Sequence, residues 1–137
     1  MPAEPVFPAM RIPTIRRVTT PVDSNLMGTV FGGAILSEID LAAAVEAHRH
    51  HSGRLVTVAL DGVVFRAPVQ VGDCVSFYTE TVRIGRTSIR VRILVWAERR
   101  FSSAEEVFVT EAEATMVAVD ERGQKQEIRK REPRKRP

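Results

Sequence analysis

The chain of 137 residues is 44% hydrophobic, which suits one globular domain with a packed core. Its single cysteine, Cys74, excludes an intramolecular disulfide, and no apolar run is long enough to span a membrane. The N-terminus lacks the basic and apolar blocks of a signal peptide, so we expect a cytoplasmic protein. Residues 122–137 hold eight Lys or Arg and two Glu, so the net charge of +3 comes from this tail and the remainder is mildly acidic. Nucleic acid is accordingly not an expected partner of the body.

A long helix is the first extended element that the sequence predicts. The nine N-terminal residues are proline-rich, residues 10–18 form a lead-in or a short strand, and residues 19–30 carry the turn-forming side chains of a loop. The helix is expected from about Gly33 to about His51, because alanine is frequent there and Gly53 follows as a stop.

Four long strands are predicted after the helix. Residues 54–67, 74–84, 88–99 and 107–119 alternate or are rich in β-branched side chains, and Pro68 and glycine-containing turns separate them. One helix with about five strands predicts an α+β fold in which a curved antiparallel sheet wraps around a central helix. The helix is apolar around much of its surface, which implies a sheet that curls around it. The outer or edge surface of that sheet would then need a partner chain, so we also expect a homo-oligomer.

The glycine pair before the helix and an acid within it form a candidate site. A helix that starts at Gly32-Gly33 offers unpaired N–H groups and its positive dipole end to an oxygen that gains negative charge. Roughly two turns on, Asp40 falls in an apolar stripe, where desolvation would make a carboxylate a tunable base. This combination suggests acyl chemistry. The pair alone would also suit a tight turn, and the acid would also suit a structural carboxylate.

Other motifs favour simpler explanations. His48, His50 and His51 have no accompanying acid or cysteine ligand set, so we expect a solvated helix end and no metal site. Cys74 at a strand start suits a small packed side chain rather than a nucleophile. The basic tail, residues 126–137, is expected to be flexible and solvated, with nucleic acid, an acidic membrane surface or CoA phosphates as alternative contacts.

The segment Asn25-x-x-Gly28-x-x-Phe31-Gly32-Gly33, followed by Asp40, resembles a known family. The chain is similar to the hotdog-fold acyl-CoA thioesterases, in particular the bacterial YciA-like branch of broad specificity. The further matching segments are residues 54–59, 65–68, 71–73, 85–88, 95–96, 117–120 and 123. The resemblance covers about residues 20–125, which we take as the hotdog domain, between a lead-in at 1–19 and the tail at 126–137.

The resemblance implies hydrolysis of the acyl-CoA thioester to a free carboxylic acid and CoA, without a separate cofactor, because CoA is part of substrate and product. It implies a homodimer as the catalytic unit, often assembled into a trimer of dimers, in which Asp40 of one subunit works with Asn25 of the other. Asp40 would act as general base on water or as nucleophile through a mixed anhydride. The Gly33 N–H would polarise the thioester carbonyl, and Asn25 would orient the water or the carbonyl.

The remaining candidate site residues are expected to bind substrate. The CoA phosphates would be held by Arg86 in the turn Gly85-Arg86-Thr87-Ser88, with Arg66 as a second cationic candidate. Phe31 and Gly32 belong to the thioester site, and Val56, Thr57 and Val58 would line the acyl or pantetheine channel or simply pack in the core.

Two other functions remain open at this stage. One is a non-catalytic acyl-CoA-binding sensor on the same fold, with the basic tail as its contact to DNA. The other is a hotdog hydratase or dehydratase, which the resemblance disfavours because such enzymes pair a His with a carboxylate and Phe31 precedes the glycine pair here.

Overall fold

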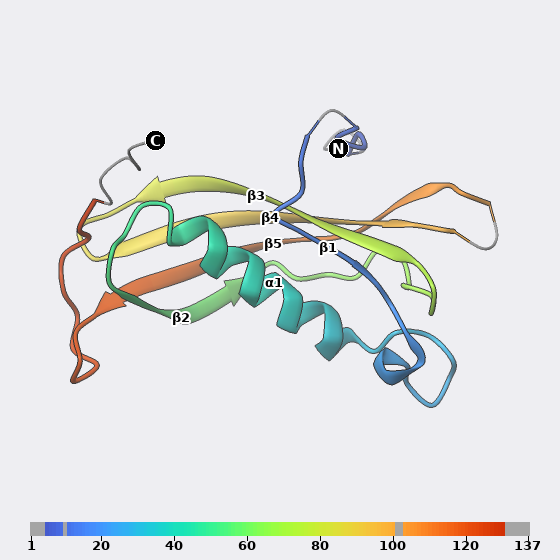
Figure 1. Ribbon diagram of the computed structural model, residues 1–137, viewed down its shortest axis with the longest axis horizontal. Helices are drawn as coiled ribbons and strands as arrows, with labels where there is room; N and C mark the ends of the chain where they lie inside the picture. The colour runs from blue at the N-terminus through green and yellow to red at the C-terminus, as the bar shows by residue number, and fades with distance from the viewer. Residues whose placement is uncertain (1–4, 10, 101–102, 131–137) are drawn as a thin grey trace, which may run out of the picture.

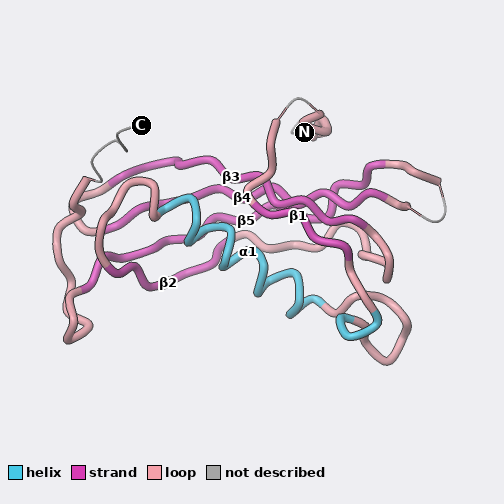
Figure 2. The backbone as a smooth tube through the Cα atoms, in the orientation of Figure 1, coloured by secondary structure: helices cyan, strands magenta, loops and turns pink. Residues whose placement is uncertain are grey.

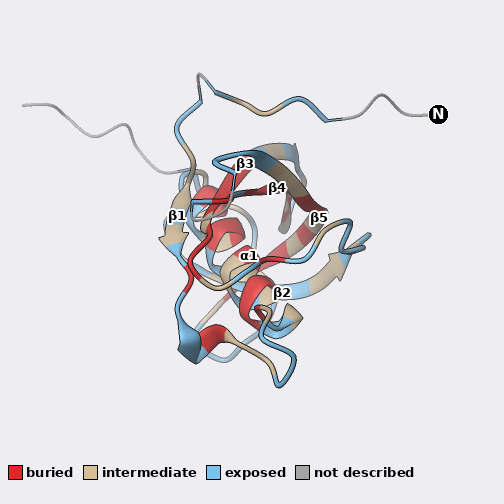
Figure 3. Ribbon diagram, turned by 90° about the vertical axis from the view of Figure 1, so that its right-hand side faces the viewer, coloured by how far each residue is buried: buried red, intermediate tan, exposed pale blue. Residues whose placement is uncertain are grey.

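The computed structural model describes residues 5–9, 11–100 and 103–130, and it contains a five-stranded antiparallel sheet packed against one long helix (Figure 1). The strands are β1 (Ile15–Val18), β2 (Arg54–Asp61), β3 (Cys74–Ile84), β4 (Ser88–Glu98) and β5 (Glu106–Val119). Their spatial order is β1-β3-β4-β5-β2, so β1 and β2 form the two edges. The sheet curls around the helix α1 (Gly32–Ala47), as the end view in Figure 3 shows. The predicted α+β fold is confirmed.

The core lies between α1 and the concave face of the sheet. Along β4 every second side chain is fully buried, namely those of Ile89, Val91, Ile93 and Val95. Ile39 is the large residue at the centre of the helix face, and the other fully buried residues of α1 are alanines. These small side chains let the helix lie close to the strands, which gives a densely packed interior.

The helix begins at Gly32 and ends at Ala47, so the predicted end near His51 is wrong. The last turn is closed by tight hydrogen bonds, in which the Arg49 N–H donates to Glu46 and the His50 N–H donates to Ala47. Bonds that span three residues end an α-helix in a narrower turn. The chain then turns inward, so that His51 is buried.

The first long strand was predicted to reach Ala67, but β2 ends at Asp61. Gly62 follows with a φ of +73°, which a strand does not accommodate. The next residues form an irregular segment beside β5, where the Arg66 N–H donates to the Val109 carbonyl. The other predicted strand bounds shift little: β3 spans the predicted residues, β4 ends at Glu98, and β5 begins at Glu106.

Segments near both termini pack on the sheet. Near the N-terminus, the Phe7 ring lies edge-on to Trp96 at a centroid distance of 5.4 Å on the convex face. Residues 126–130 were expected in a flexible tail, but Gln126 and Ile128 donate backbone hydrogen bonds to Ala118 and Arg86. The rest of the tail, residues 131–137, lies outside the described residues.

The loops gather at the two ends of the sheet (Figure 2). The short 3-10 helix η1 (Pro21–Asp23), the start of α1 and the segment after β2 lie at one end. The β3–β4 turn, the end of α1 and the returning C-terminal segment lie at the other. In the part of the chain that the structure describes, no helix has the length and apolarity needed to cross a bilayer.

Candidate active site

The tip of α1 presents two backbone amides without acceptors. Among the described residues, no acceptor is found for the N–H groups of Gly32 and Gly33, whereas the Phe31 N–H donates to Asp23 and the Ala34 N–H to Phe31. Neither glycine has a positive φ, so a left-handed backbone conformation does not explain the pair. The free amides and the helix dipole favour an oxygen that carries negative charge.

Two aromatic rings explain why both positions are glycine. A Cβ atom on Gly33 would lie 2.9 Å from the Phe31 ring, and one on Gly32 would lie 3.3 Å from the Phe65 ring. The rings therefore pack directly against the backbone that carries the free amides. Phe31 and Phe65 are themselves 44% and 43% exposed, and Gly33 is exposed too, so the tip of a single chain is open to solvent.

Asp40 lies on the side of α1 that faces β2, and its side chain is held by a threonine. The Thr57 hydroxyl donates to Asp40 Oδ1 over 2.5 Å. The Asp40 side chain is only partly buried, which differs from the enclosed carboxylate that its apolar neighbours suggested. Leu41 and Val45, about half exposed, lie roughly 100° and 140° around the helix axis from Asp40, so the adjoining side of α1 presents an apolar surface.

A β-bulge in β2 directly follows Thr57. In the pairing with β5, Thr57 lies opposite Met116 and Ala59 lies opposite Thr115, which leaves Val58 as the extra residue. Bulges bend a strand and redirect a side chain. Of the three predicted channel residues, Thr57 contacts the carboxylate, while Val56 and Val58 are 43% and 58% exposed on this edge strand.

Asn25 shapes its own loop. Its Oδ1 accepts from the Met27 and Thr29 N–H groups, and its Nδ2 donates to the Thr29 hydroxyl over 2.9 Å. An amide nitrogen carries two N–H groups, so one donor is left for another partner. None of the hydrogen bonds of Asn25 reaches Asp40 of the same chain.

The residues predicted to hold CoA fall at opposite ends of α1. Arg66 is exposed and lies beside the helix tip, where it lines a groove with Gly32 and Phe65. The turn from Gly85 to Ser88 lies at the other end, near the end of α1 (Figure 1). The turn is fastened by backbone bonds from Ala118 to Thr87 and from Ile128 to Arg86, and the exposed Arg86 side chain lies 3.6 Å from Glu127. One chain alone therefore does not bring all of the predicted site residues together.

A buried carboxylate at the other end of α1 escaped the sequence analysis. Glu46 is 7% exposed, and its two oxygens accept from the hydroxyls of Thr79 at 2.9 Å and Thr81 at 2.7 Å. Burial raises the pKa of Glu46, but these bonds and the charges of Arg49 and His50 outweigh it, so the pKa lies below its ordinary value. The sequence did contain one signal of this contact: by alternation, Thr79 and Thr81 fall on the inward face of β3, where their hydroxyls need a hydrogen-bond partner.

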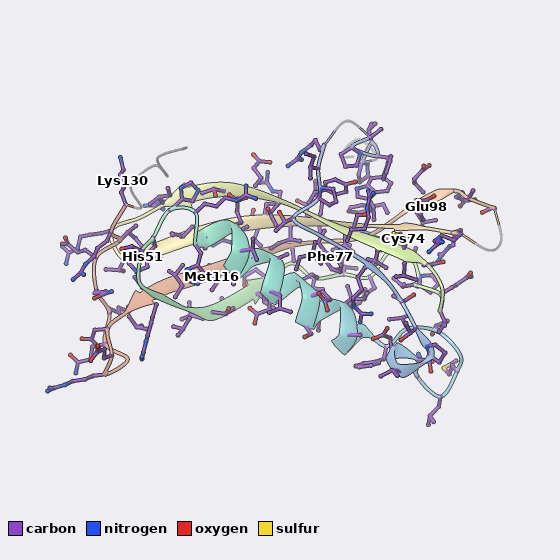
Figure 4. All side chains as sticks on the ribbon, in the orientation of Figure 1. His51, Cys74, Phe77, Glu98, Met116 and Lys130 are labelled. Carbon is purple, nitrogen blue, oxygen red and sulfur yellow. The ribbon has the colours of Figure 1, made fainter. Side chains whose placement is uncertain are left out.

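His51 corrects the expectation of a solvated helix end. Its ring is 1% exposed, its Nδ1 accepts from the Arg129 N–H over 2.9 Å, and its Nε2 is buried without a partner in the described structure. Burial lowers the pKa of His51, helped by the charges of His48 and Arg129. Figure 4 shows His51 at the same end of the molecule as Lys130. Among the described residues, no three His, Cys, Asp or Glu side chains are grouped to hold a metal ion.

The sequence matches the profile of the thioesterase superfamily over residues 27–101, more than half of the chain. The chain belongs to this superfamily. An uncharacterized acyl-CoA thioester hydrolase of Zymomonas mobilis is 40% identical over 119 residues, which cover 87% of this chain and 78% of the relative. The acyl-CoA thioester hydrolase YciA of Escherichia coli is 38% identical over 111 residues, covering 80% and 84%.

A solved hexameric hotdog fold thioesterase of Campylobacter jejuni is 42% identical, with a TM-score of 0.80 over 85% of this chain and 90% of that chain. The resemblance drawn from the sequence is therefore confirmed, and the sheet wrapped around α1 is the hotdog fold of the thioesterase superfamily. The superfamily match includes Gly32, Gly33 and Asp40, but not Asn25.

Proposed function

We propose that the protein is an acyl-CoA thioesterase, which converts acyl-CoA and water to a free carboxylic acid and CoA. The observation that carries this proposal is the Asp40 carboxylate, held by Thr57 at the edge of an exposed apolar surface. The activity named for the relatives in Zymomonas mobilis and Escherichia coli supports the same reaction.

The spacing along α1 argues that two subunits build each site. Gly33 and Asp40 are seven residues apart, which corresponds to about 10 Å along the axis at 1.5 Å per residue. One thioester group is too short to reach both an amide and a carboxylate across that span. We therefore infer that the thioester beside Asp40 of one subunit has its carbonyl oxygen bound by the helix tip and Asn25 of the partner subunit.

The surface around Asp40 supports a subunit interface. Val56, Val58, Leu41 and Val45 are exposed large hydrophobic residues on adjoining elements, and β2 is an edge strand with unpaired backbone groups. Such an edge and such a patch are usually covered in a soluble protein. A homodimer with twofold symmetry would cover both and build two sites. The hexamer named for the Campylobacter jejuni structure supports further assembly into a trimer of dimers.

The chemistry follows from these groups. In the general-base route, Asp40 takes a proton from water, and the water oxygen attacks the thioester carbon. The negative charge on the carbonyl oxygen is stabilised by the amides at the helix tip and by the free N–H of Asn25, since its Oδ1 is already occupied. The C–S bond then breaks, and the CoA sulfur receives the proton from Asp40.

The same geometry serves a nucleophilic route. Asp40 attacks the thioester carbon, and CoA leaves as the thiolate. Water then hydrolyses the mixed anhydride to the free acid and the Asp40 carboxylate, and the second proton of that water converts the CoA thiolate to the thiol. In both routes Arg86 and Arg66 are the cationic groups that bind the CoA phosphates, and Thr87 and Ser88 donate hydrogen bonds from their hydroxyls. Neither route requires a cofactor besides the CoA of the substrate.

Thiol release from a panel of acyl-CoAs, from acetyl to palmitoyl, tests the proposal. We expect turnover in the wild type and a loss of at least 10²-fold in Asp40→Ala, with the circular dichroism spectrum unchanged. A protein that binds acyl-CoA without releasing thiol would be a sensor instead. Hydration of enoyl-CoA without thiol release would support a hydratase.

A further inference from the structure

A groove of about 280 Å³ opens beside the tip of α1. Val30, Ile35, Ala67, Pro68 and Val69 line it together with Gly32, Phe65 and Arg66. Resting on the thioesterase function proposed above, we propose that this groove holds the acyl chain and that Phe65 sets the chain length that it accepts.

The groove is continuous with the amides of the helix tip. Gly32 belongs to its lining, and the Phe65 ring lies against Gly32, close enough that a Cβ there would be 3.3 Å away. A thioester whose carbonyl oxygen accepts from the tip amides therefore has its acyl carbon at the mouth of the groove. The next methylene groups meet the Phe65 ring.

The lining chemistry selects an acyl chain over the pantetheine arm. Ile35 and Val69 are each 3% exposed and Val30 is 8% exposed, so part of the lining is the outer layer of the core. Arg66 is the one residue of the lining with a polar side chain. The two amides of a pantetheine arm would lose water there with few partners, whereas methylene groups lose nothing.

The backbone around Phe65 is held in place by hydrogen bonds. On one side of this residue, the Val64 carbonyl accepts from the Thr110 hydroxyl over 2.9 Å. On the other side, the Arg66 N–H donates to the Val109 carbonyl over 2.8 Å. The Pro68 carbonyl further along accepts from Arg99 over 2.7 Å. The backbone on both sides is thus tied to β5 and to Arg99, the residue that follows β4. The Phe65 ring, which is 43% exposed, is carried by this held backbone and bounds the groove on that side.

The size of the groove predicts a preference for short to medium chains. Its volume lies just below the usual range for ligand pockets, about 300–1,000 Å³. Burial of one methylene is worth about fourfold in binding. We expect kcat/KM to rise by up to about that factor per methylene until the groove is full, and then to level off or fall.

Two variants with opposite effects test the proposal. Phe65→Ala removes the wall and should move the levelling point to acyl chains about two or more carbons longer. Ala67→Leu fills the groove and should move it to shorter chains. Phe7→Ala removes an equal ring from the convex face and should keep the wild-type profile. Melting curves and circular dichroism establish that each variant is folded, and each profile is normalised to its own best substrate.

The outcomes separate this proposal from the proposed function. If no acyl-CoA is hydrolysed by the wild type, the thioesterase function itself is wrong. If the wild type is active, and Phe65→Ala and Ala67→Leu each change kcat/KM by the same factor for every acyl-CoA, the acyl chain does not lie in the groove. If both variants raise the inhibition constant of free CoA by the same factor as they raise the KM for acyl-CoA, the groove holds the pantetheine arm and our assignment is overturned.

Discussion

The buried Glu46 gives a prediction that concerns stability alone. Its carboxylate accepts from the Thr79 and Thr81 hydroxyls and ties the last part of α1 to β3. Thr81 is also bonded to His50 over 2.9 Å. Glu46→Gln keeps the size of the side chain and removes the charge, so it converts charge-assisted hydrogen bonds into neutral ones.

The magnitude follows from the two threonine contacts. A hydrogen bond to a charged group is worth about 1.5–3 kcal/mol and a neutral one about 0.5–1.5 kcal/mol. Two bonds each weakened by about 1 kcal/mol predict that Glu46→Gln lowers the free energy of unfolding by about 2 kcal/mol at pH 7. The control Glu121→Gln, an exposed side chain in the turn after β5, makes the same change of charge and should cost less than about 0.5 kcal/mol.

The pH dependence has a definite sign. The pKa of Glu46 in the folded protein lies below its ordinary value of 4.5, so folding favours the ionised form. This stabilisation is complete above the unfolded pKa and is lost as the pH falls through the lower folded pKa. The difference between wild type and Glu46→Gln should therefore shrink when the pH falls below about 4.5.

Denaturant unfolding at one fixed protein concentration and several pH values measures this difference, since the stability of an oligomer depends on concentration. A variant as stable as the wild type at pH 7 would refute the assigned role of Glu46. A difference that persists unchanged at low pH would refute the ionised state of its carboxyl group.

Three further substitutions test other contacts. Thr57→Val removes the hydroxyl that holds Asp40 and should lower kcat about tenfold, the low end for a bond to a charged group, with little change in KM, while Thr57→Ser keeps the activity. Gly33→Ala places a methyl group 2.9 Å from the Phe31 ring but keeps the backbone N–H of residue 33. In steady-state assays kcat should therefore fall by less than the ~10²–10³-fold that follows the loss of an oxyanion donor, and the fold should be kept. Arg129→Pro removes the N–H that donates to His51 and should lower the melting temperature by several degrees, at a cost of about 1–3 kcal/mol, whereas Arg129→Ala should have a small effect. An unchanged kcat in either of the first two, or equal melting temperatures in the last pair, would contradict the corresponding contact.

The sequence allowed the fold to be predicted because its local patterns agree with the structure. The alternation in residues 88–98 gives the buried face of β4, and the turn residues around Gly85 separate β3 from β4 correctly. The glycine pair and Asp40 were found because they lie on one helix, where spacing fixes their relative positions. Patterns of this kind need no knowledge of which strands are neighbours.

The features that were missed depend on contacts between distant segments. The Thr57 contact to Asp40 joins β2 to α1, and the bulge at Val58 beside it arises from the register between β2 and β5. The apolar run after Gly62 resembles a continued strand, although its backbone follows β5 irregularly. Because Phe65 belongs to this run, its place beside the helix tip could not be predicted from the sequence pattern.

The returning C-terminal segment shows another limit. Its basic side chains predict solvation, and those of Arg129 and Lys130 are exposed. Its backbone amides, however, donate to Ala118, Arg86 and His51. Every residue except proline carries such a donor, so composition alone does not reveal where it will bond.

The central claim, that each site combines Asp40 of one subunit with Asn25 of the partner subunit, is tested most directly by complementation. Asp40→Ala and Asn25→Ala are each expected to be inactive as homo-oligomers. Co-expressed, they pair at random, so about half of the dimers are mixed, and each mixed dimer holds one intact site and one doubly altered site. We predict recovery of about a quarter of the wild-type thiol release. If the mixture were no more active than the two variants apart, the shared site would be contradicted.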